Sequence, residues 1–156
     1  FEQAGARHAR SYISTGNVTF DAPPRSVPTI TRRVEAAIEA VVGRRTEVYV
    51  RSIPHLEDLI AAEPYDGPAI PDALEREVSF LYEPIDVSGL DLPIVSSGGH
   101  LTIVRATPDE VFCAGSEVDG RRRGAGGFVE RILGQRVTTR AWATVLRVTL
   151  DPSPVD

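Results

Sequence analysis

The sequence predicts an α+β fold of two related ferredoxin-like halves, each built on the plan βαββαβ. Strand-length alternating runs and helix-length amphipathic runs follow each other along the 156 residues, which favours mixed layers of helix and sheet. The first half reads strand, strand, helix, strand, so it lacks its first strand and most of its first helix, and the second half is a degenerate copy. We expect halves at 1–64 and 65–150, a tail at 151–156, and one compact structural domain.

The stretch YISTGNVTF, residues 12–20, predicts a β-hairpin. Val18 and Phe20 alternate with polar neighbours, as on a half-buried strand. Gly16–Asn17 is a pair typical of two-residue hairpin turns, because glycine tolerates the positive φ that such turns require. Two prolines then end the second strand.

Residues 26–43 are predicted to form the clearest helix. Ser26 is expected to cap its start, and Gly43 to end it. Its buried face is predicted from apolar residues that recur every three or four positions: Ile30, Val34, Ile38 and Val41. Residues 46–52 then predict a strand. Residues 52–64 predict a second helix, which repeats the serine–proline entry of the first.

The second half begins after a proline-rich connection. Residues 76–84 predict a strand, 85–99 a loop or short helix, and 100–115 a hairpin that reverses at Thr107–Asp109. A flexible glycine- and arginine-rich crossing follows.

Two helices are predicted near the end of the chain. The first covers 127–135, with inward-facing Phe128, Val129, Ile132 and Leu133. The second covers 138–150, is capped by Thr139, and buries Trp142, Val145 and Leu146.

Composition excludes several classes of function. The formal net charge is −5, which opposes general binding to nucleic acid unless a basic patch is concentrated locally. All 17 basic residues are arginines, so Schiff-base chemistry and a P-loop lysine are excluded. With a single cysteine, neither an internal disulfide nor a zinc site of several thiolates can form, which suits a cytoplasmic location. No run is long enough to span a bilayer, and the chain lacks the methionine of a natural start.

The Ser14–Asn17 turn is the first candidate site. Ser14 lacks the G-x-S-x-G surroundings of a strained nucleophile, so a catalytic role is disfavoured. Exposed amides and hydroxyls at such a turn can bind an anion. A plain turn is the competing interpretation.

Two further candidates involve arginine. Arg121, Arg122 and Arg123 stand among glycines and could contact a phosphate or RNA, although such a run is usually solvated surface. Arg140 stands at the expected start of the last helix, where main-chain amides can receive an anion. Trp142 either joins that site or anchors the helix on the sheet.

The other reactive side chains receive no role. His8, His55 and His100 are scattered, so no metal site is expected. Cys113 is expected to be a small buried hydrophobic residue. Acidic residues near turns, such as Asp109 and Glu110, more often cap or face solvent than act as catalytic acids and bases.

These segments together resemble a known family. The chain resembles the domain of unknown function 1697 over roughly residues 1 to 147. The segments that carry the resemblance are SYISTGNVTF, the following amphipathic helix, the V-x-V-R run, the next leucine-rich helix and the terminal VTTRAWATV. The resemblance implies an α+β body of two related halves and no established activity. Ser14, Gly16 and Asn17 match its first motif, and Arg140 and Trp142 its last. The resemblance also implies a serine–lysine pair where this chain has Gly124–Ala125–Gly126, so no function that depends on this pair is expected here.

The sequence therefore favours a small soluble binding or accessory domain with an anionic or nucleotide-like ligand site. No catalytic motif, cofactor or membrane contact is predicted. One alternative is an enzyme whose site includes residues before Phe1, and a weaker one is RNA contact through Arg121–Arg123.

Overall fold

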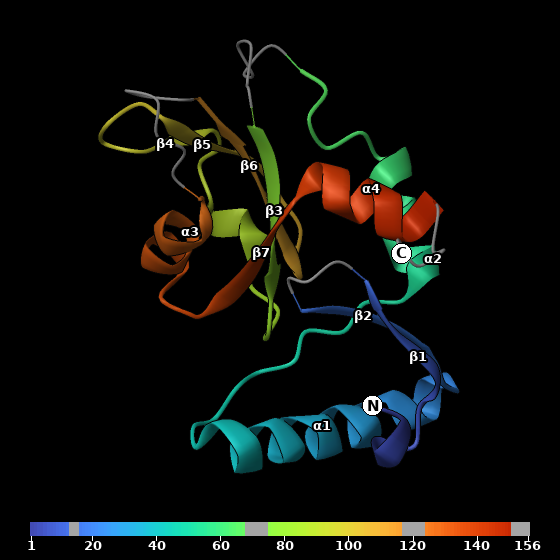
Figure 1. The fold of residues 1–156 in the computed structure, drawn as a ribbon. Helices are drawn as coiled ribbons and strands as arrows, with labels where there is room; N and C mark the ends of the chain where they lie inside the picture. Colours follow the sequence, from blue (N-terminus) through green and yellow to red (C-terminus); the bar gives the residue numbers. More distant parts are fainter. Residues whose placement is uncertain (13–15, 68–74, 117–123, 151–156) are drawn as a thin grey trace. The chain divides into compact units, whose positions relative to one another are not determined.

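The computed structural model describes residues 1–12, 16–67, 75–116 and 124–150. The chain divides into two compact units (Figure 1). The first unit comprises Phe1–Val50 and the residues from Arg147 onward, and the second comprises Arg51–Leu146. Helices and strands occur in both, so the α+β class predicted from the sequence is confirmed. In the described part of the chain, no helix is long and apolar enough to cross a membrane.

The first unit opens with the predicted hairpin. After the 3₁₀ turn η1 (Glu2–Ala4), β1 (Arg7–Tyr12) pairs antiparallel with β2 (Asn17–Asp21). Tyr12 lies opposite Asn17, so Asn17 is a strand residue and the prediction of a two-residue Gly16–Asn17 turn is wrong. Gly16 has the expected positive φ, +80°. Residues 13–15 lie outside the described ones.

Helix α1 (Val27–Val42) confirms the clearest sequence prediction, and Gly43 ends it at a φ of +74°. The predicted cap is wrong: Ser26 closes the 3₁₀ turn η2 (Pro24–Ser26) and makes no side-chain capping bond. Ile30 and Val34 are buried against η1, but the Val41 side chain is 87% exposed. The apolar cluster does not extend as far as the last turn of the helix.

The strand predicted over 46–52 does not form. These residues precede α2 without belonging to a helix or strand. The Val48 amide donates to the Glu35 carboxylate, 2.9 Å away. Alternation makes a segment compatible with a strand, but a strand also needs a neighbour that supplies the hydrogen-bond ladder.

The second unit begins with α2 (Ile53–Ala61), as predicted. Ser52 caps it by accepting a 3.3 Å bond from the His55 amide, and Leu56 and Leu59 form its buried side.

A five-stranded sheet forms the body of the second unit. Its strands are β3 (Glu75–Leu81), β4 (Ile94–Val95), β5 (Leu101–Ala106), β6 (Glu110–Gly115) and β7 (Val137–Ala141). They lie in the order β4-β5-β6-β3-β7, and all neighbours are antiparallel. The strand over 76–84 and the hairpin over 100–115 are thus confirmed, and the 85–99 segment contains the 3₁₀ turn η3 (Val87–Gly89) and β4.

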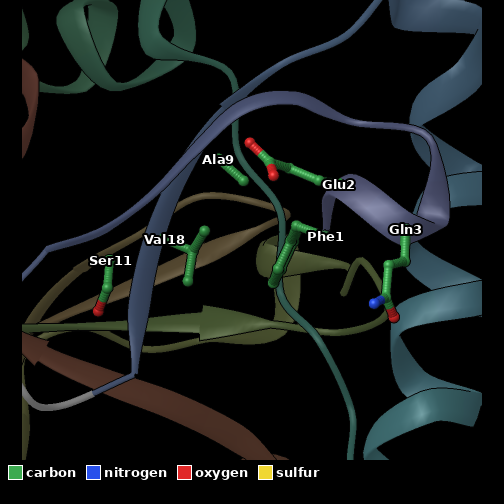
Figure 2. Close-up of a pocket in the computed structure, with 6 residues that line it drawn as sticks. All are labelled: Phe1, Glu2, Gln3, Ala9, Ser11 and Val18. Atoms are coloured by element: carbon green, nitrogen blue, oxygen red, sulfur yellow. The ribbon is translucent and has the colours of Figure 1, made fainter.

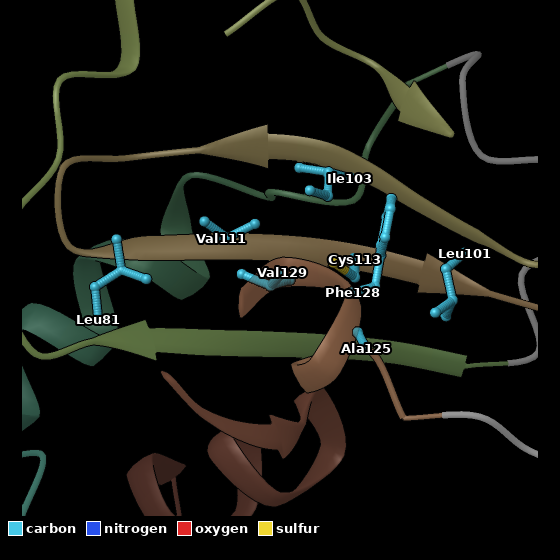
Figure 3. Close-up of a cluster of buried hydrophobic side chains, with 8 residues drawn as sticks. All are labelled: Leu81, Leu101, Ile103, Val111, Cys113, Ala125, Phe128 and Val129. Carbon is cyan, nitrogen blue, oxygen red and sulfur yellow. The ribbon is translucent and has the colours of Figure 1, made fainter. Parts of the chain in front are cut away.

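Helix α3 (Gly126–Leu133) packs on one face of this sheet (Figure 3). Phe128 and Val129 are buried as predicted, whereas Ile132 is 39% exposed because it lies on the solvent side of the helix. The buried cluster beneath α3 consists of Leu81, Leu101, Ile103, Val111, Cys113, Ala125, Phe128 and Val129.

The prediction of a single helix over 138–150 is wrong for its first turn. Residues to Ala141 form β7, and only then does α4 (Trp142–Leu150) begin. Thr139 is therefore not a cap: it lies opposite Ser79 on β3, and their hydroxyls are 2.8 Å apart. β-Branched threonines fit a strand, and β3 offers an edge on which to pair. Trp142 and Val145 are buried as expected.

Candidate functional site

The hairpin of the first unit contains an irregularity that brings basic side chains together. Arg10 lies opposite Thr19, but Arg7 lies opposite Asp21, so β1 uses two residues, His8 and Ala9, where β2 uses one. This is a β-bulge. His8 has a φ of +50°, which is uncommon for a residue other than glycine.

Arg7 and Arg10 consequently share one face of the hairpin. Directly opposite residues of an antiparallel pair project to the same side, and Thr19 and Asp21 are two residues apart on β2. Both arginines are exposed, and neither has a hydrogen-bond or ion-pair partner among the residues that the structure describes. Two guanidinium groups are thus available to a ligand.

Asp21 is the carboxylate expected to neutralise Arg7, yet it pairs with His8 instead. His8 Nδ1 and Asp21 Oδ2 are 2.8 Å apart, and both side chains are exposed. The bulge places the imidazole where it can make this contact.

The predicted residues of this region are only partly described. Gly16 is exposed and Asn17 begins β2 opposite Tyr12, while Ser14 lies outside the described residues. The sequence reasoning missed Arg7 and Arg10, since a spacing of three along a regular strand places side chains on opposite faces.

The other face of the hairpin has different chemistry. An open hollow there is lined by Phe1, Glu2, Gln3, Ala9, Ser11 and Val18 (Figure 2). Its charged side chain is the carboxylate of Glu2. The hollow therefore does not suit an anion, in contrast to the face that carries the two arginines.

Arg140 and Trp142 belong to the second unit and are engaged in its packing. Arg140 lies within β7, not at a helix start, and donates to Thr138 Oγ1 at 2.8 Å and to the Thr139 carbonyl at 2.9 Å. Burial lowers the pKa of its guanidinium. Trp142 is buried edge-on against Tyr65 and Phe112, with ring centroids 5.5 and 5.9 Å away. This packing favours the interpretation that Trp142 anchors the last helix on the sheet over the interpretation that it contacts a ligand.

Comparison with known proteins places the chain in a family. The model of the family described as "Protein of unknown function (DUF1697)" matches residues 1–94, which include the whole β1–β2 hairpin. The chain belongs to this family. Comparisons with curated proteins and with solved structures gave no match. The family resemblance seen in the sequence is thereby confirmed over residues 1–94, and its predicted last motif lies beyond the matched range. DUF1697 membership assigns no activity.

In this DUF1697 chain, a carboxylate from β3 contacts the start of α3. The Ala125 amide, at the start of α3, donates to Glu77 Oε2 at 2.7 Å. Burial raises the pKa of Glu77, an effect that this bond partly offsets. The neighbouring arginines 121–123 lie outside the described residues, so their predicted phosphate contact stays a prediction.

A second polar cluster surrounds Glu110, whose side chain is fully buried. Arg51 donates to Oε1 from Nε at 2.7 Å, and His55 Nε2 lies 2.9 Å from the same oxygen. Thr107 donates to Oε2 at 2.7 Å. Burial by itself raises the pKa of Glu110, but these hydrogen bonds and the Arg51 charge outweigh it and lower the pKa.

This Glu110 cluster fastens the turn between β5 and β6. A second Arg51 nitrogen donates to the carbonyls of Leu81 and Asp109, each at 2.9 Å. Arg51 thereby ties the end of β3 to that turn. The cluster is an ion-pair network that holds backbone in place, and sequence reasoning could not find it because its members are far apart in the chain.

Metal and thiol chemistry receive no support from the described residues. Among them, no group of three or more histidine, cysteine or acidic residues is arranged to hold a metal ion. Cys113 is buried, as predicted, and burial raises the pKa of its thiol to about 12. A thiol of this kind is not a nucleophile at neutral pH.

Proposed function

We propose that this DUF1697 protein is a small binding or accessory domain that takes an anionic ligand on the β1–β2 hairpin. One observation carries the proposal: Arg7 and Arg10 are exposed on one face and, within the described residues, neither is paired with a carboxylate. Arginine provides planar, bidentate recognition of phosphate and carboxylate groups.

The distribution of charge supports this location. The first unit, residues 1–50 and 147–156, contains eight arginines and seven acidic residues, a formal charge of +1. Residues 51–146 contain nine arginines and fifteen acidic residues, a formal charge of −6. An anion is therefore attracted to the first unit and repelled by the second.

The Gly16–Asn17 end of the hairpin extends the proposed surface. Asn17 lies two residues before Thr19, on the same face as Arg10. Ser14 stays a candidate from the sequence, whereas Arg140 and Trp142 leave the proposed site because they pack within the second unit.

Thermal unfolding in the presence of anions tests the proposal. The panel contains phosphate, a phosphate monoester, citrate and a short oligonucleotide. A ligand at a hundred times its Kd stabilises the native state by about 2.7 kcal/mol, which raises Tm by roughly 5 to 10 °C for a chain of this size. Arg10→Ala should reduce the rise by at least about half, and Arg44→Ala, which changes an exposed arginine elsewhere in the same unit, should retain it. A panel without any rise refutes anion binding.

We also propose that the second unit is a ferredoxin-like half. Support comes from its sheet: without β4, the order β5-β6-β3-β7 corresponds to the 2-3-1-4 order of that plan, and α3 connects β6 to β7. The segment with η3 and β4 stands in place of the first helix. The buried free cysteine suits the cytoplasmic location that we expect. The boundary between 64 and 65 stays a prediction, which limited proteolysis can test.

A further inference from the structure

The bulge in β1 has a consequence for the anion site, and the inference drawn from it rests on the proposed function. Arg7 and Arg10 are three residues apart, a spacing that would place them on opposite faces of a regular strand. The additional residue is accommodated at His8–Ala9, where β1 has two residues opposite one of β2. The bulge therefore determines that the two guanidinium groups face the same way.

The geometry of the shared face fits a single small ligand. Because Thr19 and Asp21 are two residues apart on β2, the Cα atoms of the arginines opposite them are separated by about 7 Å along the strands. The long arginine stems can close this separation, so that both guanidinium groups reach one phosphoryl group. The Thr19 hydroxyl lies on the same face and can add a hydrogen bond.

Asp21 would oppose such a ligand if its carboxylate were free. It lies opposite Arg7, where an ion pair would both occupy the guanidinium and repel an anion. The structure shows a different pairing, since Asp21 Oδ2 is 2.8 Å from His8 Nδ1. His8, the residue in the bulge, thus pairs with the Asp21 carboxylate, which would otherwise pair with Arg7.

We propose that the bulged hairpin is a two-arginine clamp for the phosphoryl group of a small phosphate ester. Arg7 and Arg10 grip the phosphoryl oxygens, and His8 keeps Asp21 from competing for Arg7. Two arginines match the charge of one phosphate dianion, whereas single-stranded nucleic acid requires a longer basic track with exposed aromatic side chains. The only aromatic residue of β1, Tyr12, is buried.

Calorimetric titration at low salt tests the clamp, with inorganic phosphate and glycerol phosphate as probes. Arg7→Ala and Arg10→Ala should each weaken binding at least tenfold, the loss typical of a charge-assisted hydrogen bond. Arg44→Ala should bind like the wild type. Circular dichroism confirms that each variant is folded, as expected for exposed side chains.

Changes at His8 and Asp21 test the second part. Glycine accepts the positive φ of the bulge, so His8→Gly should keep the register but release Asp21, and binding should weaken severalfold. Adding Asp21→Asn to His8→Gly should restore binding, because the competing charge is then removed. Equal affinity of His8→Gly and the wild type would overturn the role of His8.

The outcomes separate the clamp from the proposed function. If Arg10→Ala loses phosphate binding while Arg7→Ala retains the affinity of the wild type, the two-arginine clamp is wrong and anion binding on the hairpin stands. If neither phosphate nor citrate binds, the proposed function itself fails. If an oligonucleotide binds far more tightly than glycerol phosphate and its affinity falls steeply with salt, the ligand class is wrong.

Discussion

Replacing Glu110 with glutamine perturbs a fully buried charge without changing the shape of its side chain. In the wild type, Glu110 accepts hydrogen bonds from Arg51, His55 and Thr107. Glutamine substitutes a donor amide for one acceptor oxygen, so an N–H group must face either the Arg51–His55 side or the Thr107 hydroxyl. The Arg51 side chain, only 18% exposed, would also lose its counter-charge.

The expected loss of stability follows from this geometry. Breaking a buried ion pair by removing one charge costs about 3 to 5 kcal/mol, because the remaining charge stays desolvated. For a chain of this length, a loss of about 3 kcal/mol lowers Tm by roughly 6 to 12 °C. The double variant Glu110→Gln with Arg51→Met should recover only the part of the loss that comes from the unpaired Arg51 charge, since it also removes the donor to the Leu81 and Asp109 carbonyls.

Urea unfolding at pH 7, followed by the fluorescence of Trp142, measures this effect. Trp142 is the single tryptophan and is buried in the second unit, which also contains Glu110. The matched control is Glu57→Gln, an exposed glutamate on α2 that should change stability by less than about 0.5 kcal/mol. A loss below about 1 kcal/mol for Glu110→Gln would refute the conclusion that this ion pair holds the turn.

Three other outcomes are expected. The pKa of Glu110 is lowered in the folded state, so ionised Glu110 stabilises the fold. This stabilisation is complete above the unfolded pKa of about 4.3 and is lost as pH falls through the folded pKa. The stability of Glu110→Gln, measured by acid titration, should therefore lack this loss. The pKa of Glu77 is raised in the folded state, so the ionisation of Glu77 lowers the stability of the fold as pH rises. The side chain of Glu77→Gln can still accept the hydrogen bond from the Ala125 amide. The Tm of this variant should therefore match or exceed that of the wild type at pH 7, and the advantage should be lost at acidic pH. Gly43→Ala should cost about 1 kcal/mol in urea unfolding because of its positive φ alone, since a Cβ there would meet no atom within 4 Å; an unchanged midpoint would contradict this.

The sequence predicted most elements whose signal is local. Helix α1 follows from the recurrence of Ile30 and Val34 and from the glycine at its end, and the hairpin of β5 and β6 follows from alternating runs around a proline turn. These features depend on neighbours within a few residues. The same reasoning failed for 46–52 and for the start of the last helix, where the state of the chain depends on whether another strand is available to pair.

The candidate sites were less predictable than the elements. Gly16 and Asn17 stood out because turn residues have a recognisable composition. Arg7 and Arg10 did not, because the face that a strand residue occupies depends on a bulge, and the bulge is visible only in the pairing of β1 with β2. Glu110 and its partner Arg51 are 59 residues apart, and their pairing follows from the way α2 and the β5–β6 turn meet.

By itself, the sequence determined the α+β class, the DUF1697 family, the absence of lysine chemistry and most helix and strand positions. These depend on composition and on periodicities of two and 3.6 residues, which each segment contains without reference to the rest of the chain. Only the tertiary structure decided that Arg7 and Arg10 share a face, that His8 pairs with Asp21, and that the buried Glu110 carboxylate pairs with Arg51. Such contacts join residues whose separation in sequence has no fixed relation to their separation in space. They form only when the strands have paired in their native register.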